Sequence, residues 1–366
     1  MTTLAGDPTL SCRREEIRHR GVVTGALIAA LVVVLRYVPT TSNLFVFPLI
    51  ENYAYDLAYE YSVPAPPADI AIVAIDDISL QPGHQGRWPW PRRTHAELLR
   101  KLTGARVVAF DIIFSEPDRY NPENDAQFAA AIAEAGNVVL AAYRAVKMEY
   151  APQRAHVRWG WEAPPDPVPV QGIQVENLMP PIALLAGAAA AIGYVDIAPD
   201  ADGVFRRVEP LRLGSDGRLY PHIGTAIAQL AAGATRERIV AGLSEGYISA
   251  TEARCPLDAD GTMLIDYCGP TGTIERVGAW EVLEGHVDPS RFRDKIVLIG
   301  ASASGLYDMR PSPYRSTGRE FIGVETNANV VNSLLHTGAR APATKSLAWA
   351  LMALVLGLAV GWLAWC

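Results

Sequence analysis

The stretch that decides the fold runs from Phe292 to Leu335, FRDKIVLIGASASGLYDMRPSPYRSTGREFIGVETNANVVNSLL. Within it, Ile296 to Ile299 form a continuous apolar run rich in β-branched residues, which is typical of a strand buried on both faces. The small residues Gly300 to Ala303 follow directly. A buried strand that ends in small residues predicts a crevice at the carboxyl edge of an open α/β sheet.

A helix is predicted after the polar loop that follows this strand. Val324, Ala328, Val331 and Leu335 recur at spacings of four, three and four residues, so they share one face of a helix over 323–335. Ten residues beyond this helix, the chain reaches a long apolar segment. The stretch therefore links a candidate ligand crevice to a predicted membrane span.

Strands and helices alternate in the first half of the chain. Apolar runs and helical spacings predict strands over 70–75, 107–114 and 138–142 and helices over 94–102 and 124–135. Thr94, with Glu97 three residues later, predicts a capping box at the first of these helices. This alternation implies parallel strands joined by right-handed crossovers. We therefore predict an α/β fold, a mainly parallel sheet flanked by helices with antiparallel additions.

Further elements are predicted on either side of this alternation. The same patterns give helices over 43–61, 183–191, 222–232 and 280–284 and strands over 192–197, 204–213 and 263–267. Residues 151–172 are rich in proline and include Trp159 and Trp161, and they predict a surface loop.

Two apolar segments are long enough to cross a bilayer as helices, residues 21–38 and residues 346–366. Four arginines precede the first segment, at positions 13, 14, 18 and 20, and they favour a cytoplasmic N-terminus over residues 1–20. We therefore expect an extracytoplasmic domain over 43–338, in the periplasm or outside the cell, anchored in the cytoplasmic (inner) membrane. A cleavable secretion signal is the alternative reading of the first segment.

The predicted outer region, residues 39–345, is acidic. It carries 27 Lys and Arg against 36 Asp and Glu, a net charge of −9. This balance argues against nucleic acid and against docking onto anionic lipid. Cys255 and Cys268 lie in this region, and the sequence leaves a disulfide between them open.

Metal and cofactor signals are weak. None of the seven histidines is spaced as a zinc pair, and no paired C-x-x-C occurs. Residues 200–203, Asp-Ala-Asp-Gly, resemble the start of a calcium loop, but the later ligands are absent, so a turn is favoured. We expect no metal, no cofactor and no catalytic residue.

Polar residues at strand ends are the better candidates for a binding site. Asp76, Asp77, Asp111 and Ser302 would lie near the carboxyl edge of one sheet. Glu325, Asn327 and Asn329 open the last predicted helix. Capping and loop hydrogen bonds account for the same residues, and we favour that alternative over ligand binding. The predicted ligand-binding set is Asp76, Asp111, Ser302, Asp308, Glu325 and Asn329.

The chain resembles the CHASE domain of the second type, the cyclase/histidine-kinase-associated sensory extracellular domain. The resemblance covers roughly residues 43–335, and it rests on an ordered set of segments rather than on one motif. These segments are residues 70–77, 108–114, 193–196, 200–206, 295–302, 305–308 and 323–329.

The resemblance implies the sensory ectodomain of a bacterial membrane receptor. In that family, closely spaced membrane helices and a cytoplasmic output usually follow: a nucleotide (adenylate) cyclase, histidine kinase, diguanylate cyclase or protein kinase. We expect the partner to be an unknown extracytoplasmic signal, a small molecule or a protein, and the receptor to be a homodimer. One span and no output follow here, so we expect the chain to be part of a longer receptor.

Two rival readings come from other classes of protein. One is a membrane-anchored periplasmic enzyme that uses Asp76, Asp111 and Ser302. The other is a structural envelope protein with an inert pocket. Turnover on a substrate panel would favour the enzyme, whereas a ligand-dependent thermal shift without turnover would favour the sensor.

Overall fold

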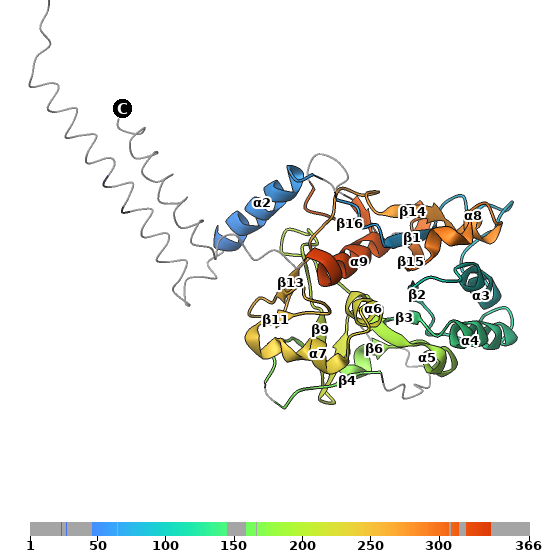
Figure 1. Cartoon of the computed structure of the whole chain (residues 1–366), viewed down its shortest axis with the longest axis horizontal. Helices are drawn as coiled ribbons and strands as arrows, with labels where there is room; N and C mark the ends of the chain where they lie inside the picture. Colours follow the sequence, from blue (N-terminus) through green and yellow to red (C-terminus); the bar gives the residue numbers. More distant parts are fainter. Residues whose placement is uncertain are drawn as a thin grey trace, which may run out of the picture. The chain divides into compact units, whose positions relative to one another are not determined.

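The computed structural model describes Val23, Leu27 and residues 46–63, 65–144, 159–165, 167–306, 309–314 and 320–337 (Figure 1). The chain divides into two compact units, residues 1–58 with 341–366 and residues 59–340. The helix α2 (Val46–Glu60) crosses from the first unit into the second. The architecture described below is that of the second unit.

A seven-stranded sheet forms the centre of this unit. Six strands run parallel in the order β14-β1-β15-β2-β3-β7, and β6 pairs antiparallel with the end of β3. Their bounds are Glu275–Gly278 (β14), Ile70–Ile75 (β1), Ile296–Ala301 (β15), Val107–Ile113 (β2), Val138–Arg144 (β3), Ala191–Tyr194 (β7) and Leu178–Met179 (β6). Every residue of β1 is buried, as expected for a strand covered on both faces.

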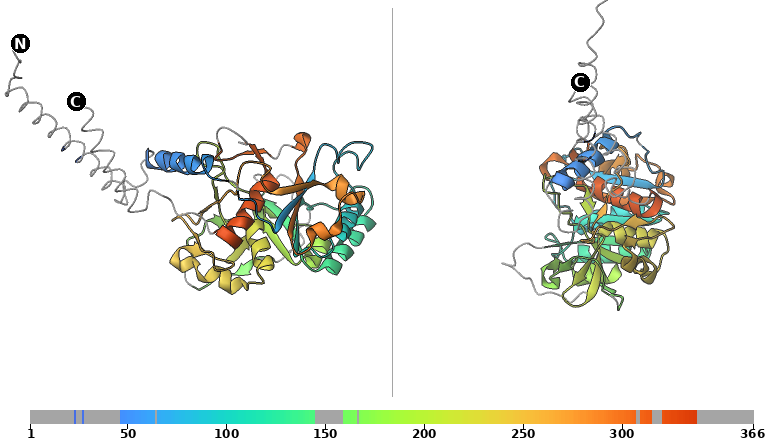
Figure 2. Two further views of the ribbon diagram at one scale, coloured as in Figure 1. Left: turned by 45° about the horizontal axis from the view of Figure 1, so that its top comes forward. Right: turned by 90° about the vertical axis from the view of Figure 1, so that its left-hand side faces the viewer.

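Helices cover both faces of the sheet (Figures 1 and 2). One face packs against α3 (Arg92–Lys101), α4 (Glu123–Ala135), α5 (Ala183–Ala188) and α8 (Ala279–Leu283). The other face packs against α6 (Ile223–Ala231) and α9 (Gly323–Asn332). The mainly parallel sheet flanked by helices was predicted from the sequence and is confirmed; the structure does not test the extracytoplasmic placement.

The two faces differ in the size of their side chains. Under α3 and α4, large rings fill the core, and Phe110, Phe114 and Phe128 lie edge to face with centroids 5.2 to 5.8 Å apart. Under α6, the sheet presents Gly193, where a Cβ atom would lie 2.4 Å from the Cα of Ile223. The backbone of α6 can therefore approach the sheet only because this position has no side chain.

Short strands outside the main sheet supply the antiparallel additions. A four-stranded sheet contains β4 (Trp161–Glu162), β10 (Arg218–Pro221), β9 (Leu211–Gly214) and β5 (Gly172–Ile173). The strand β10 pairs antiparallel with β4 and β9, whereas β5 pairs parallel with β9. Three two-stranded pairs are β11 (Tyr247–Ile248) with β12 (Cys255–Pro256), β8 (Arg207–Val208) with β13 (Met263–Leu264), and β16 (Met309–Pro311) with β17 (Glu320–Ile322). The remaining helix, α7 (Arg236–Ala241), is followed by 3₁₀ turns.

Three local predictions were wrong. The helix α3 starts at Arg92, not after Thr94, because Asp118 from a distant loop accepts a hydrogen bond from the Arg92 N–H at 2.6 Å. The predicted strand over 204–213 is two strands, since Pro210 between them has no N–H to donate. Part of the predicted surface loop over 151–172 forms β4, and its Trp161 is buried.

The predicted spans cannot be compared with the structure. Apart from Val23 and Leu27, residues 21–38 and 346–366 lie outside the described residues. Among the residues that are described, no helix combines the length and the apolar character that a bilayer crossing requires.

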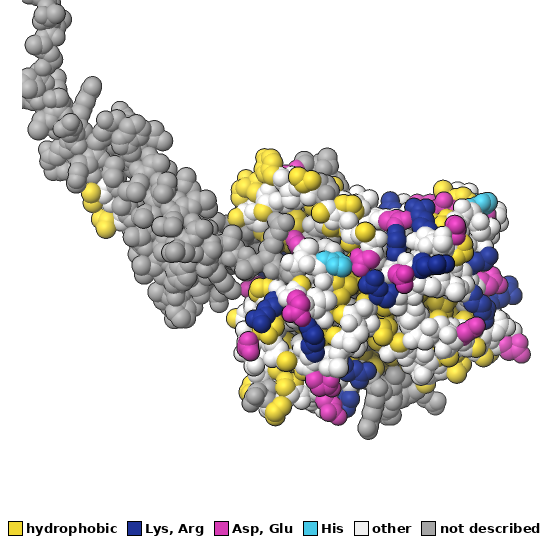
Figure 3. Space-filling view, viewed as in Figure 1, with side chains coloured by type: hydrophobic (Ala, Val, Ile, Leu, Met, Phe, Trp, Pro, Cys, Tyr) yellow, Lys and Arg dark blue, Asp and Glu magenta, His cyan; other side chains and the backbone are white. Residues whose placement is uncertain are grey.

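Positive and negative side chains are interspersed over the face of the second unit that Figure 3 shows. This face carries no broad patch of one sign. That the domain does not bind nucleic acid, which requires a clustered basic surface, stays a prediction.

Candidate functional site

The predicted site residues on three neighbouring strands meet at the carboxyl edge of the sheet. Asp111 on β2 pairs with Gly300 on β15, and Ser302 follows two residues later. Ile75, at the end of β1, pairs with Ala301, so Asp76 lies at the same edge. The Ser302 N–H donates a hydrogen bond to the Ile75 carbonyl at 3.0 Å. The structure therefore brings Asp76, Asp111 and Ser302 to one edge of the sheet, as predicted.

Asp111 holds the first turns of α9. The Asn327 side chain donates from Nδ2 to Asp111 Oδ2 at 2.8 Å, and Asn327 is fully buried. The other amide atom, Asn327 Oδ1, is buried with no hydrogen-bond partner among the described residues. A buried polar atom without a partner carries a free-energy cost, and water or a ligand group can relieve it.

Asp76 lies at this edge but is bound to a different part of the fold. Its Oδ1 accepts hydrogen bonds from the Ser79 backbone N–H at 2.8 Å and from the Ser79 hydroxyl at 2.6 Å. The Ser79 hydroxyl in turn accepts from the Trp280 N–H of α8 at 3.2 Å. Asp77 accepts from the Ser304 N–H at 3.2 Å. Both carboxylates thus fix loops at the sheet edge.

Glu325 and Asn329 bond not to Asp111 but to the segment over 265–272, which ends in a turn. Gly272 donates its N–H to Glu325 Oε1 at 2.8 Å, and the Thr271 hydroxyl donates to Oε2 at 2.9 Å. Asn329 Oδ1 accepts from the Cys268 N–H at 2.9 Å. Ser333, one turn further, accepts from the Asp266 N–H at 2.8 Å. We call these three side chains, Glu325, Asn329 and Ser333, the α9 ladder.

The predicted strand over 263–267 ends at Leu264, and the α9 ladder bonds to the segment that follows. Residues four apart on a helix lie on one face, so the three ladder side chains line up along the 265–272 segment. Within the predicted strand, Ser333 accepts the Asp266 N–H, which a neighbouring strand would otherwise accept. Burial raises the pKa of the Glu325 carboxyl above its ordinary value, although the hydrogen bonds from Gly272 and Thr271 act in the opposite direction.

The far end of the ladder reaches α2. The Tyr59 hydroxyl, in the last turn of α2, donates to Asp266 Oδ1 at 2.5 Å. Asp266 is the residue whose N–H bonds to Ser333. Ser333 begins a π-helical turn over Ser333–Thr337, the last described residues of the chain. Single π-turns inside helices are frequent at functional sites.

Sequence reasoning missed a second buried polar group near this edge. His222 caps α6, and its Nδ1 accepts from the Gly224 N–H at 3.1 Å. His222 is fully buried, and its Nε2 has no hydrogen-bond partner among the described residues. Burial, with the positive charges of Arg310 and Arg212, holds the pKa of His222 well below its ordinary value. Its position directly before an apolar helix was the available signal.

His222 belongs to a cluster around Tyr194 at the end of β7. The rings of His222 and Tyr194 are 5.4 Å apart and nearly perpendicular. The Arg212 guanidinium lies 5.1 Å from the Tyr194 ring centroid and pairs with Glu209. The carboxyl edge therefore holds neutral and charged donors that the sequence analysis did not place there.

The remaining predicted residues and motifs have the following places. Asp308 lies outside the described residues. Cys255 and Cys268 are buried free thiols, so the disulfide that the sequence left open does not form. The Asp200–Gly203 loop is a turn, as predicted, and Asp200 and Asp202 pair with the buried Arg206 at 3.0 and 2.9 Å. Within the described ranges, no group of three or more His, Cys, Asp or Glu could hold a metal ion.

Comparison with known proteins gives one match. A family model described as the CHASE2 domain matches residues 27–363, nearly the whole chain. No curated protein and no solved structure matches the sequence.

Proposed function

Since the chain belongs to the CHASE2 domain family, a family of sensory extracellular domains, we propose that it is the sensory ectodomain of a membrane-bound receptor. The domain would receive an extracytoplasmic small-molecule or protein signal and pass it to a cytoplasmic output such as a nucleotide cyclase or kinase. Residues 21–38 and 346–366 would anchor it in the cytoplasmic membrane, and the receptor would act as a homodimer.

One observation carries this proposal: hydrogen bonds link α9 to Asp111 at the sheet edge and, through Asp266, to Tyr59 at the end of α2. The first turns of α9 bond to Asp111 through Asn327, and its ladder bonds to the segment that holds Tyr59. All ten residues of α9 are buried, so the helix is packed on every side. Packed elements of this kind shift as units rather than deform, which lets a change at one end reach the other.

The signal would bind at the carboxyl edge of the sheet, near Asp111 and Ser302. Ligands of open α/β sheets bind outside the carboxyl ends of the strands. The unpartnered Asn327 Oδ1 at this edge is an acceptor that a ligand could use. Glu325 and Asn329 would not contact the ligand, because their side chains bond to the 265–272 segment. They would instead transmit its effect along α9. A ligand shifts the domain only if it binds one arrangement of α9 better than the other.

The rival enzyme is less well supported. Nucleophilic catalysis needs a base within hydrogen-bond reach of the nucleophile. The two carboxylates proposed to assist Ser302 have other partners, since Asp76 accepts from Ser79 and Asp111 accepts from Asn327. The arrangement at the edge therefore fits structural support and binding better than catalysis.

Hydrogen exchange on the full chain in detergent micelles tests the coupling that this function requires. Asn327→Asp places a second carboxylate against Asp111 and disturbs only the first end of α9. We expect faster exchange at the amides of Asp266 and Cys268, at the far end of the ladder. Asn121→Asp, on an exposed loop, is the matched control and should change neither amide. Faster exchange confined to the residues around Asp111 would contradict the proposal.

A further inference from the structure

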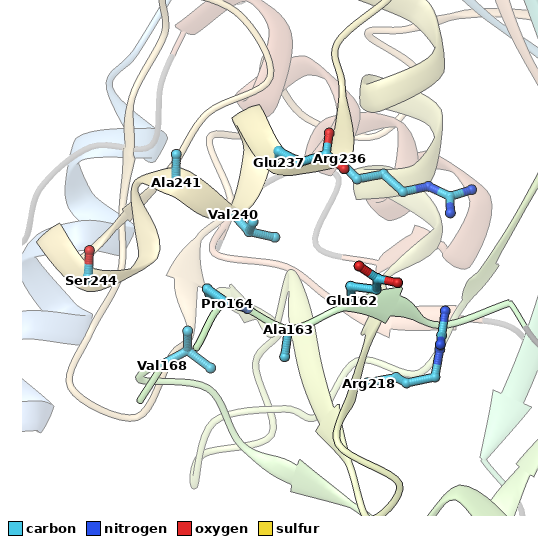
Figure 4. A pocket seen from close by; sticks show the side chains of 10 residues that line it. All are labelled: Glu162, Ala163, Pro164, Val168, Arg218, Arg236, Glu237, Val240, Ala241 and Ser244. Carbon is cyan, nitrogen blue, oxygen red and sulfur yellow. The ribbon is translucent and has the colours of Figure 1, made fainter. Parts of the chain in front are cut away.

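A hollow lies between α7 and the four-stranded sheet (Figure 4). Its volume is about 660 Å³, within the range of pockets that hold small molecules. Its walls come from α7, from β10 and from the chain after β4. We call this hollow the α7 groove.

One end of the α7 groove carries two arginines, Arg218 and Arg236. Arg218 donates from Nε and Nη2 to the Gly160 carbonyl at 2.9 and 2.5 Å. The Arg236 guanidinium lies 5.9 Å from the ring centroid of the buried Trp161. Among the described residues, neither guanidinium forms an ion pair with a carboxylate, so both retain donors for a ligand.

Acidic side chains lie at the same groove. Figure 4 shows the carboxylate of Glu162 near the charged ends of Arg218 and Arg236. Glu237, on α7, also lines the groove. Two positive and two negative side chains give no net charge. A simple anion would gain from the arginines but would be repelled by the carboxylates.

The other part of the α7 groove is apolar. Figure 4 shows Pro164, Ala163 and Val168 below Val240 of α7, away from the guanidinium groups. Val168 and Val240 are partly exposed, so their side chains would lose contact with water when an apolar group covers them. The groove thus combines a charged end of both signs with an apolar wall.

We propose that the α7 groove binds a small zwitterion with an apolar side chain, an α-amino acid or a short peptide. The carboxylate of the ligand lies between Arg218 and Arg236, and its ammonium lies beside Glu162. Guanidinium groups match carboxylates because their planar N–H donors form paired, charge-assisted hydrogen bonds. The apolar side chain of the ligand covers Val168 and Val240.

This inference goes beyond the proposed function. It concerns binding alone, and the groove can be occupied whether or not α9 transmits a signal. Its failure would leave the coupling along α9 untouched, and loss of that coupling would leave binding in the groove intact.

The test is a ligand-observed NMR titration of the full chain in detergent micelles. The probes are L-leucine and the dipeptide Leu-Leu, which separate a free amino acid from a peptide source. We expect saturable binding of at least one. L-leucinamide lacks the carboxylate, N-acetyl-L-leucine lacks the ammonium, and glycine lacks the apolar side chain. Each of these three should bind at least tenfold more weakly than the better probe.

Two substitutions locate the binding. Arg236→Gln and Glu162→Gln should each weaken binding about tenfold, since each removes one charge-assisted contact. Both side chains are exposed, so neither change should lower the unfolding temperature. The matched controls are Arg238→Gln, on the same helix but outside the groove, and Glu97→Gln on α3. Unchanged affinity in Arg236→Gln, equally tight binding of leucinamide, or no saturable binding of either probe would overturn the proposal.

Discussion

A Cβ atom added to Gly300 would lie 2.6 Å from the Cβ of Val324, closer than two such atoms approach in proteins. Gly300 is the fifth residue of β15, and Val324 is the second residue of α9. The missing side chain is therefore what allows the first turn of α9 to lie directly on the sheet. Further along α9, Asn327 bonds to Asp111 at 2.8 Å.

Gly300→Ala should destabilise the domain by about 1–3 kcal/mol, because overpacking forces either α9 or β15 to move. The measurement is the urea midpoint of the full chain in detergent. Gly187→Ala on α5 is the control, since no atom lies within 4 Å of its added Cβ, and we expect it to be neutral or slightly stabilising.

A second substitution separates crowding from a general loss of stability. Val324→Ala removes the atoms that the new methyl group meets. In a double-mutant cycle, the pair Gly300→Ala and Val324→Ala should be more stable than the sum of the two single effects predicts. Additive effects would show that the contact between these residues does not determine the packing.

The sequence was sufficient to predict the local elements of the sheet. The strand over 70–75 has the predicted bounds, and the strand after Lys295 differs by two residues, because uninterrupted apolar runs need both faces covered. The order of the strands was not predictable. The strand β15 lies between β1 and β2, although about two hundred residues separate it from either, and no periodicity encodes such a neighbour.

The candidate site was also predictable only in part. Asp76, Asp111 and Ser302 were placed at one edge because parallel strands end together. The direction in which each side chain points depends on tertiary contacts. Glu325 and Asn329 share a helix with Asn327, yet they face the 265–272 segment while Asn327 faces Asp111. The α9 ladder joins residues more than fifty positions apart, and a single sequence does not reveal which pairs meet.

Glu325→Gln should change how stability depends on pH. The pKa of Glu325 is raised in the folded state by burial, so folding favours the protonated form. Glu325 contributes most to stability below the pKa that its carboxyl has in the unfolded chain, about 4.3. This contribution decreases as the pH rises through the higher pKa of the folded state. A glutamine stays neutral, so the stability of the variant relative to the parent should increase as the pH rises above the unfolded pKa, and the gain should persist at higher pH.

The measurement for Glu325 is the free energy of unfolding by urea at pH 5 and pH 7.5. Glutamine keeps an acceptor for the Gly272 N–H, so the ladder bond at this position should survive. Glu97→Gln, exposed on α3, is the control and should leave the pH dependence unchanged. If both variants show the pH dependence of the parent, Glu325 is not the buried acid that the structure describes.

His95 should make the domain sensitive to acid. It is fully buried on α3 among aromatic rings, and its pKa is lowered to about 3 by burial, with a further effect from Arg92. The unfolded chain takes up a proton near pH 6.5, whereas the folded chain does not. The free energy of unfolding is therefore unaffected by His95 above about pH 6.5. It decreases as the pH falls, by about 2 kcal/mol at pH 5.

His95→Phe should remove this loss, because phenylalanine fits an aromatic cluster and does not titrate. Thermal unfolding at pH 7.5 and pH 5 would show a smaller decrease in the unfolding temperature for the variant than for the parent. His286→Phe is the control, since the His286 side chain is 57% exposed. An equal decrease in parent and His95→Phe would assign the acid sensitivity to other groups.

The last prediction concerns which side of the membrane holds residues 39–345. Lys and Arg near a first span stay in the cytoplasm, and here four arginines precede residue 21. Alkaline phosphatase fused after Gly338 should therefore be active in cells, and a reporter that works only in the cytoplasm should be silent at the same position. Replacing the four arginines with glutamine should reduce the phosphatase activity, because the charge bias that orients the span is gone, whereas Arg87→Gln, an exposed residue of the second unit, should not. Activity of the cytoplasmic reporter alone would place the domain inside the cell and exclude an extracytoplasmic signal.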